Sequence, residues 1–77
     1  MNKRINIIAF GQIAEITGRE LKMDAEDLKA LNHLLTETFP LLKEKKYAIA
    51  INKRLTSGNV ALRDNDVVAL MPPYSGG

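Results

Sequence analysis

Apolar and polar residues alternate with period two near the start of the chain, over residues 4–10. Such alternation is typical of a β-strand. Because both faces carry apolar side chains, the pattern suits a central strand covered on at least part of each face. One face would hold Ile5, Ile7 and Ala9, and the other Asn6, Ile8 and Phe10. Gly11 ends the strand, and a short helical turn over 12–16 is expected to stop at Gly18.

A second strand is predicted over 19–23, with Leu21 and Met23 facing inward and a hairpin-like pairing with the first strand. The strongest helical pattern covers 25–39, where Asp24 can cap the first turn and Pro40 ends the helix. Apolar residues recur there at helical spacing, which predicts one buried stripe. The stripe would consist of Leu28, Leu31, Leu34, Leu35 and Phe39.

Three further extended segments follow this helix. The first, over 47–52, has larger apolar residues on one face and two alanines on the other, where a helix can approach closely. Short extended pieces are expected at Leu55 and at 60–62, separated by a turn over 57–59. A second turn, over 63–66, leads into the strand 67–71, which is wholly apolar and suits a buried central position.

The order of these elements predicts an α+β domain of the β-grasp (ubiquitin-like) type. A helix that joins two strands of one sheet makes a right-handed crossover, so the first and last strands can lie side by side and parallel. We expect a mixed sheet of four to five strands with one main helix packed on one face. The domain would cover residues 1–71, and residues 72–77 would form a flexible tail.

The size and composition of the chain argue against an active site of its own. Seventy-seven residues provide one small core and little room for an enclosed substrate pocket. The net charge of +2 does not indicate a nucleic-acid or membrane partner. No apolar run approaches the roughly twenty residues of a membrane span, so a cytoplasmic location is expected. The basic cluster Lys43, Lys45 and Lys46 is either a solvated helix end or a docking patch.

Side chains that usually carry chemistry are sparse. The chain has no cysteine and one histidine, His33, within the predicted helix, so no metal site and no bound cofactor are expected. Asp64 and Asp66 bracket a turn, where hydrogen bonds from their carboxylates to the backbone explain them better than acid–base catalysis. If the protein handles sulfur, it cannot do so on a side-chain thiol.

The C-terminal segment is the remaining candidate for chemistry. Pro72 and Pro73 favour an extended conformation that directs the tail away from the sheet. The six residues span about 20 Å, and the two final glycines lack the Cβ atoms that would block a narrow channel. Adenylation would turn the carboxylate of Gly77 into an acyl electrophile that a sulfur nucleophile can attack. The tail consists of Pro72, Pro73, Tyr74, Ser75, Gly76 and Gly77.

Several segments resemble the small subunits of molybdopterin synthase, and the likeness covers essentially the whole chain. They are the segment 49–52, the turn 62–66, the strand 67–71, the Pro-Pro-x-x-Gly-Gly ending and the run 10–18. The resemblance implies that an ATP-dependent, ubiquitin-activating-like adenylyltransferase adenylates Gly77. A sulfur donor, such as a cysteine desulfurase system, would then form a thiocarboxylate. The loaded tail would enter the large subunit and give sulfur to cyclic pyranopterin monophosphate.

The same resemblance implies a heterotetramer in which two small subunits bind a dimer of large ones. It places Phe10, Leu55 and Met71 at the interface with the large subunit, close to the point where Pro72 leaves the sheet. The chain departs from the family pattern at Ala14, where Arg is frequent, at Asn65, where Gly is usual, and at Met71, where an aromatic residue is common. The change at Asn65 is physically mild, and those at Ala14 and Met71 affect individual interface contacts and not the chemistry of the tail.

Other functions share the fold and the Gly-Gly ending. A carrier for thiamine synthesis usually lacks the helical turn at 12–18 and the Pro-Pro pair, and both features are present here. A carrier for tRNA thiolation, a tungsten-pathway relative and a ubiquitin-like protein modifier stay open as alternatives.

Overall fold

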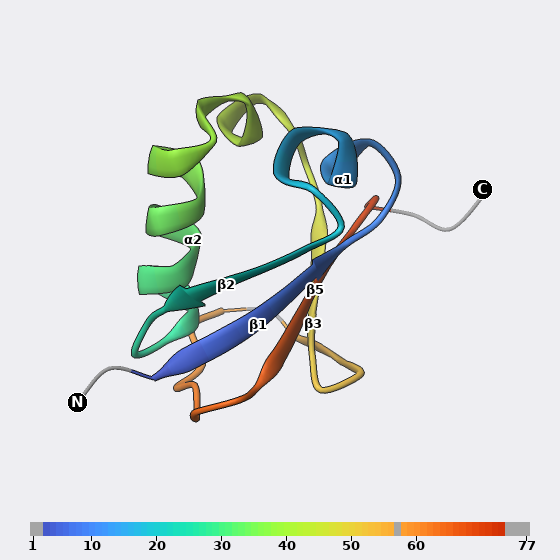
Figure 1. The fold of residues 1–77 in the computed structure, drawn as a ribbon. Coiled ribbons are helices and arrows are strands. Elements are labelled where there is room, and N and C mark those ends of the chain that lie inside the picture. Colours follow the sequence, from blue (N-terminus) through green and yellow to red (C-terminus); the bar gives the residue numbers. More distant parts are fainter. Residues whose placement is uncertain (1–2, 57, 74–77) are drawn as a thin grey trace.

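The computed structural model describes residues 3–56 and 58–73. It contains a five-stranded sheet, one long helix and two short helices (Figure 1). In chain order the elements are β1 (Arg4–Ala9), α1 (Gly11–Thr17), β2 (Glu20–Asp24), α2 (Leu28–Thr38), the 3₁₀ helix η1 (Pro40–Glu44), β3 (Ala48–Ile51), β4 (Arg54–Thr56) and β5 (Val67–Met71).

The strand order in the sheet is β2-β1-β5-β3-β4. The first and last strands, β1 and β5, are parallel neighbours in the middle of the sheet, and the pairs β1–β2, β3–β5 and β3–β4 are antiparallel. Figure 1 shows α2 crossing one side of this sheet. The predicted α+β, β-grasp architecture with a mixed sheet and one main helix is therefore confirmed.

One face of the sheet, which we call the inner face, forms the hydrophobic core with the helices. Its central residues are at most 4 % exposed, and they pack in one cluster with buried residues of α1, α2 and η1. Burial of apolar surface at about 25 cal/mol per Å² makes this cluster the main source of stability. The inner face comprises Ile5, Ile7, Ala9, Val68 and Leu70.

The opposite face, the outer face, carries Asn6, Ile8, Val67, Ala69 and Met71, all of which are half-buried or exposed. The expectation that β5 is buried on both faces is therefore wrong: Val67 is 37 % exposed because the helices pack on the inner face only. The alanine face of β3 was expected to lie under a helix, and this is also wrong. Tyr47, Ile49 and Ile51 pack against the core, whereas the two alanines belong to the outer face.

Helix α2 begins at Leu28, three residues later than predicted. Its N-cap is Asp27, whose carboxylate accepts a hydrogen bond from the Ala30 amide at 2.8 Å. Residues 25–27 stay outside the helix because the Ala25 amide bonds to the Lys3 carbonyl and Asp27 forms a bridge with Ala61. The predicted apolar stripe is buried at Leu28, Leu31 and Leu35, but Leu34 is 39 % exposed.

The segment around Leu55 is a true strand, because β4 forms a hairpin with β3. Asn52 and Lys53 connect the two strands with φ angles of 50° and 74°, and the left-handed conformation at both positions matches the twist of a tight hairpin. The piece over 60–62, in contrast, makes only the isolated bridge of Ala61 with Asp27, although Leu62 is fully buried.

Candidate functional site: an apolar sheet face beside the tail exit

The register of the sheet places a row of apolar residues across the outer face. Leu55 on β4 lies opposite Ala50 on β3, which lies opposite Ala69 on β5. Ala69 in turn lies opposite Ile8 on β1. Directly opposed residues point to the same side of a sheet, so these four side chains share one face. At about 4.8 Å per strand, Leu55 lies about 10 Å from Ala69.

The other two residues of the predicted interface extend this row toward the end of β5. Met71 follows Ala69 by two positions, lies opposite Ala48 and is half-buried. Phe10 follows Ile8 by two positions and has an extended backbone, with φ −130° and ψ 157°. The structure therefore places Phe10, Leu55 and Met71 on the outer face, where Phe10 is 49 % and Leu55 74 % exposed. Exposed apolar side chains that gather in this way are typical of a partner-binding surface.

The tail leaves the domain at the edge of this face. The Phe10 amide donates a hydrogen bond to the Leu70 carbonyl at 3.0 Å, which continues the β1–β5 pairing to the end of the sheet. Gly11 then lies against Pro72: a Cβ atom at Gly11 would stand 3.1 Å from the Pro72 Cγ atom, and its φ is +57°. Glycine is therefore suited to this position for two reasons, close approach and a left-handed backbone. Pro72 and Pro73 are exposed.

A shallow hollow of about 660 Å³ adjoins the outer face beside Phe10. Ile8, Ala14 and Arg19 contribute to its wall. Ala14 is one of the positions at which the chain departs from the pattern of molybdopterin synthase small subunits, so its short side chain leaves this space open. The expected site residues Tyr74, Ser75, Gly76 and Gly77 lie outside the described residues.

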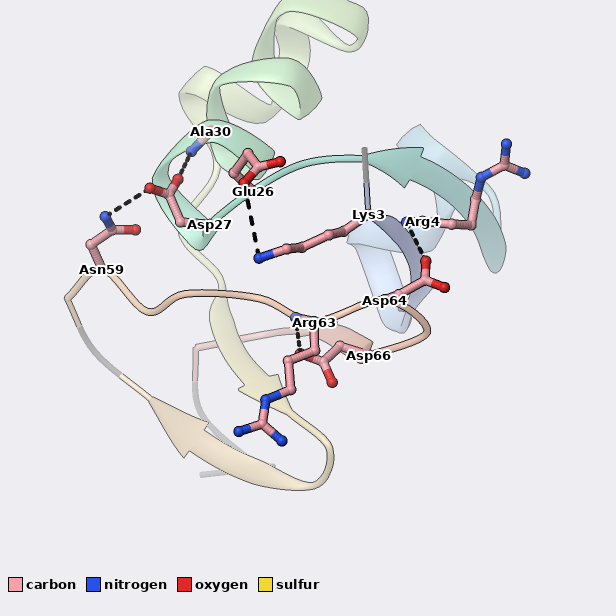
Figure 2. Close-up of polar contacts among 9 residues, drawn as sticks. All are labelled: Lys3, Arg4, Glu26, Asp27, Ala30, Asn59, Arg63, Asp64 and Asp66. Carbon is pink, nitrogen blue, oxygen red and sulfur yellow. Dashed lines mark hydrogen bonds and ion pairs between the residues drawn. The ribbon is translucent and has the colours of Figure 1, made fainter. Parts of the chain in front are cut away.

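The acidic residues of the 63–66 turn have a structural role, as predicted (Figure 2). Asp64 accepts a hydrogen bond from the Arg4 amide at 2.7 Å, and Asp66 accepts one from the Arg63 amide at 2.8 Å. Asp66 also accepts from the Asn52 side chain at 2.9 Å. The backbone bond from Arg63, followed by that from Asn52, lowers the pKa of Asp66 below its ordinary value. These carboxylates connect the start of β1, the β3–β4 hairpin and β5.

A second polar contact fixes the N-terminal end of α2. Asp27 accepts from the Ala30 amide and, at 3.2 Å, from the side chain of Asn59, as Figure 2 shows. The bond from Ala30, followed by that from Asn59, lowers the pKa of Asp27. His33 is exposed on α2. Within 3–56 and 58–73, no three His, Asp or Glu side chains are grouped closely enough to hold a metal ion.

Reasoning from the sequence missed the contact between Gly11 and Pro72. From the sequence, Gly11 is interpreted only as the end of a strand. The predicted parallel pairing of the first and last strands would have placed Gly11 close to Pro72. Since Ala9 lies opposite Leu70, the next residues along each strand bring Phe10 beside Met71 and Gly11 beside Pro72.

Comparisons with known proteins agree with this geometry. The family model described as the ThiS family matches residues 7–77. Subunit 1 of the Helicobacter pylori molybdopterin-converting factor, solved in complex with subunit 2, is 36% identical; the match covers 96% of this chain and 99% of that chain, with a TM-score of 0.77.

Two further structures share the fold at lower identity. The small archaeal modifier protein 1 of Methanosarcina acetivorans is 22% identical, with a TM-score of 0.83 and coverage of 100% of this chain and 99% of that one. A Pyrococcus furiosus protein described as subunit 1 of molybdopterin converting factor is 22% identical, with a TM-score of 0.85 and coverage of 94% and 99%.

None of the helices in the described part of the chain is long and apolar enough to cross a membrane. The family match runs from the middle of β1 to the final Gly-Gly, and the H. pylori relative is 36% identical to this chain. The chain therefore belongs to the ThiS family of ubiquitin-like sulfur carriers, the ThiS/MoaD type.

Proposed function

We propose that this protein is the sulfur-carrying small subunit of molybdopterin synthase and that Gly77 is the residue that carries the sulfur. The observation that carries the proposal is the position of the tail: the central strand β5 ends beside an exposed apolar face, and Pro72 leaves the sheet there. The 36% identity with subunit 1 of a molybdopterin-converting factor supports the choice of pathway.

The proposed chemistry takes place on the terminal carboxylate. A carboxylate oxygen of Gly77 attacks the α-phosphorus of ATP on an activating enzyme of the ubiquitin-activating type, and pyrophosphate leaves. The terminal sulfur of a donor persulfide, such as that of a cysteine desulfurase system, then attacks the acyl carbon and displaces AMP, which gives an acyl disulfide. A thiol of the donor system cleaves the S–S bond, so that Gly77 keeps the sulfur as a thiocarboxylate and the donor is released as a disulfide. The small subunit binds no cofactor in this scheme, because ATP is held by the activating enzyme.

Transfer of the sulfur would take place in the large subunit. The loaded tail enters its pocket and gives its sulfur to cyclic pyranopterin monophosphate, and water returns the acyl group of Gly77 to a carboxylate. Two such transfers supply the two sulfur atoms of the molybdopterin dithiolene. The large subunit supplies the catalytic side chains, and two small subunits on a dimer of large ones form a heterotetramer. We place this assembly in the cytoplasm.

The outer face is the proposed contact with the large subunit. The exposed Phe10 and Leu55 and the half-buried Met71 are its apolar residues near the tail, and Ile8 and Ala69 lie between them. An interface needs a desolvated apolar centre, and the inner-face residues cannot provide one because they are buried in the core.

The mass of the protein after activation tests the proposal. The purified chain is incubated with ATP and an extract of cells of its own organism, recovered, and measured intact. The expected product has one oxygen of Gly77 replaced by sulfur, and it does not form when ATP is omitted. A stable isopeptide bond between Gly77 and target lysines, with no thiocarboxylate, would instead identify a ubiquitin-like protein modifier and contradict the proposal.

A further inference from the structure

The basic cluster Lys43, Lys45 and Lys46 begins in the last turn of η1 and borders two hollows. Lys43 forms an ion pair with Glu37 of α2, with 4.0 Å between the Lys43 Nζ and Glu37 Oε2 atoms. All three lysines border a hollow of about 410 Å³ beside α2 and Tyr47. Lys45 and Lys46, but not Lys43, also border a hollow of about 370 Å³ whose wall includes Pro72 and Pro73. The tail of the protein thus leaves the domain beside two cationic side chains.

This hollow is cationic. Lys45 and Lys46 are its only charged residues among those that the structure describes, and the rest of its wall is formed by Gly11, Gln12, Ile13 and the two prolines. Both lysines are exposed, and neither forms an ion pair with another residue of 3–56 or 58–73. Two like charges held side by side repel each other, so an anionic group placed at the hollow would be attracted by both.

The position of the lysines relative to the tail is fixed by the sheet. Ala48, two residues after Lys46, lies opposite Met71, the residue before Pro72. Pro72 itself lies against Gly11 on the other side of the hollow. Any protein that takes the tail into a pocket must therefore bring the mouth of that pocket close to Lys45 and Lys46.

We propose that Lys45 and Lys46 bind acidic side chains at the mouth of the pocket in which the activating enzyme receives the tail. This inference rests on the proposed function. The apolar outer face suits the lasting complex with the large subunit, whereas the activating enzyme must bind and release many carriers. Opposite charges at the rim of an interface increase the rate of encounter more than they increase the lifetime of the complex. The lysines therefore select and speed the approach of the carrier to its activating enzyme.

Charge reversal tests this inference. The double variant Lys45→Glu/Lys46→Glu is compared with Lys29→Glu/Lys53→Glu, which changes the net charge equally. Lys53 lies in the β3–β4 turn, at the end of the sheet away from Met71, and Lys29 lies in the first turn of α2. Carrier-dependent ATP–pyrophosphate exchange by the activating enzyme is measured over a range of carrier and salt concentrations, and circular dichroism checks that each variant is folded.

The expected result is a fall in kcat/KM of at least about tenfold at low salt for Lys45→Glu/Lys46→Glu, with kcat unchanged. The loss should shrink as salt rises, because exposed charges are screened over about 8 Å at 0.15 M ionic strength. Lys45→Arg/Lys46→Arg should keep the wild-type rate, since it keeps the charge. The remote pair should also stay close to wild type.

Two results would overturn the inference while the proposed function stands. In the first, the two double variants are activated equally well. In the second, Lys45→Glu/Lys46→Glu is activated normally but binds the large subunit more weakly, which would assign the lysines to the other partner. If the wild-type chain itself supports no exchange, the proposed function fails and this inference fails with it.

Discussion

The two faces of the sheet are formed by the same strands but differ in burial. On β1 and β5, every second side chain belongs to the inner face and is at most 4 % exposed, while the side chains between them lie on the outer face and are partly accessible. Buried residues of α1, α2 and η1 pack against the inner face. The outer face is apolar but contributes little to the core, so its residues are free to serve recognition. The two faces therefore separate positions that fold the protein from positions available for the proposed contact with a partner.

The largest effect on stability is expected on the inner face. Leu70→Ala removes a fully buried side chain at the centre of the sheet and should lower the free energy of unfolding by about 2–5 kcal/mol. Urea denaturation of the variant and of wild type measures this difference. Met71→Ala, one residue further along the same strand but on the outer face, is the control and should cost much less. Equal losses at the two positions would break the distinction between the faces.

The second largest effect concerns binding, and it is expected on the outer face instead of the inner face. Leu55→Asp should lower affinity for the large subunit by about thirtyfold or more, because a charge would be desolvated inside the interface. Its melting temperature should stay within about 4 °C of wild type, since Leu55 is 74 % exposed. Titration calorimetry and a thermal melt measure the two quantities.

Leu34→Asp is the matched control for this variant. Leu34 is also partly exposed, but it lies on α2, on the opposite side of the sheet. It should leave binding to the large subunit unchanged. Normal binding by Leu55→Asp, or equal losses in the two variants, would show that the outer face is not the contact surface.

The fold was predictable where a short-range pattern determined it. Alternation located β1, the wholly apolar run 67–71 located β5, and the leucine spacing located α2. The start of α2 was not predictable in this way, because Asp24 and Asp27 are equally good caps by local chemistry. The contacts of residues 25–27 with Lys3 and Ala61, both distant in the sequence, select Asp27. Leu34 is 39 % exposed because it lies beside, and not within, the row of buried residues Leu28, Leu31 and Leu35 on α2.

The candidate site also combines features that a short-range pattern predicts with features that depend on contacts between distant segments. The Pro-Pro-x-x-Gly-Gly pattern marks the tail directly, because its chemistry depends on residue types in consecutive positions. The hollow formed by Lys45, Lys46 and Pro72 depends on the pairing of Ala48 with Met71, which places separate segments together. Sequence left two interpretations of the basic cluster open, and only the register of β3 and β5 shows which lysines reach the tail.

The smallest effect is expected at the polar turn that ties β1 to β5. Hydrogen bonds from Arg63 and Asn52 lower the pKa of Asp66 from its ordinary value of 3.8, so the folded state favours the charged carboxylate. A lowered pKa gives stability above the unfolded-state value, and this stability is lost as pH falls from about 5 through the folded-state pKa. Asp66→Asn should therefore lower the melting temperature by about 2–4 °C at pH 7, because solvent screens this exposed site.

The difference between Asp66→Asn and wild type should shrink as pH falls through the lowered pKa of Asp66, because the wild-type side chain then also becomes neutral. Asp64→Asn is a useful companion, because Asp64 accepts its bond from Arg4 and tests the neighbouring attachment. A destabilisation by Asp66→Asn that is constant from pH 7 to pH 2 would mean that the charge of Asp66 does not contribute.

The central claim, that the C-terminal glycine carries the sulfur, is tested most directly by removing that glycine. A chain that lacks Gly77 is combined with the activating enzyme, sulfur donor, ATP, large subunit and cyclic pyranopterin monophosphate, and molybdopterin formation is measured beside wild type. The account predicts an unchanged melting temperature and no molybdopterin, because the shortened tail cannot bring a carboxylate to the position where activation and transfer take place. Molybdopterin synthesis at the wild-type rate by the chain without Gly77 would contradict it.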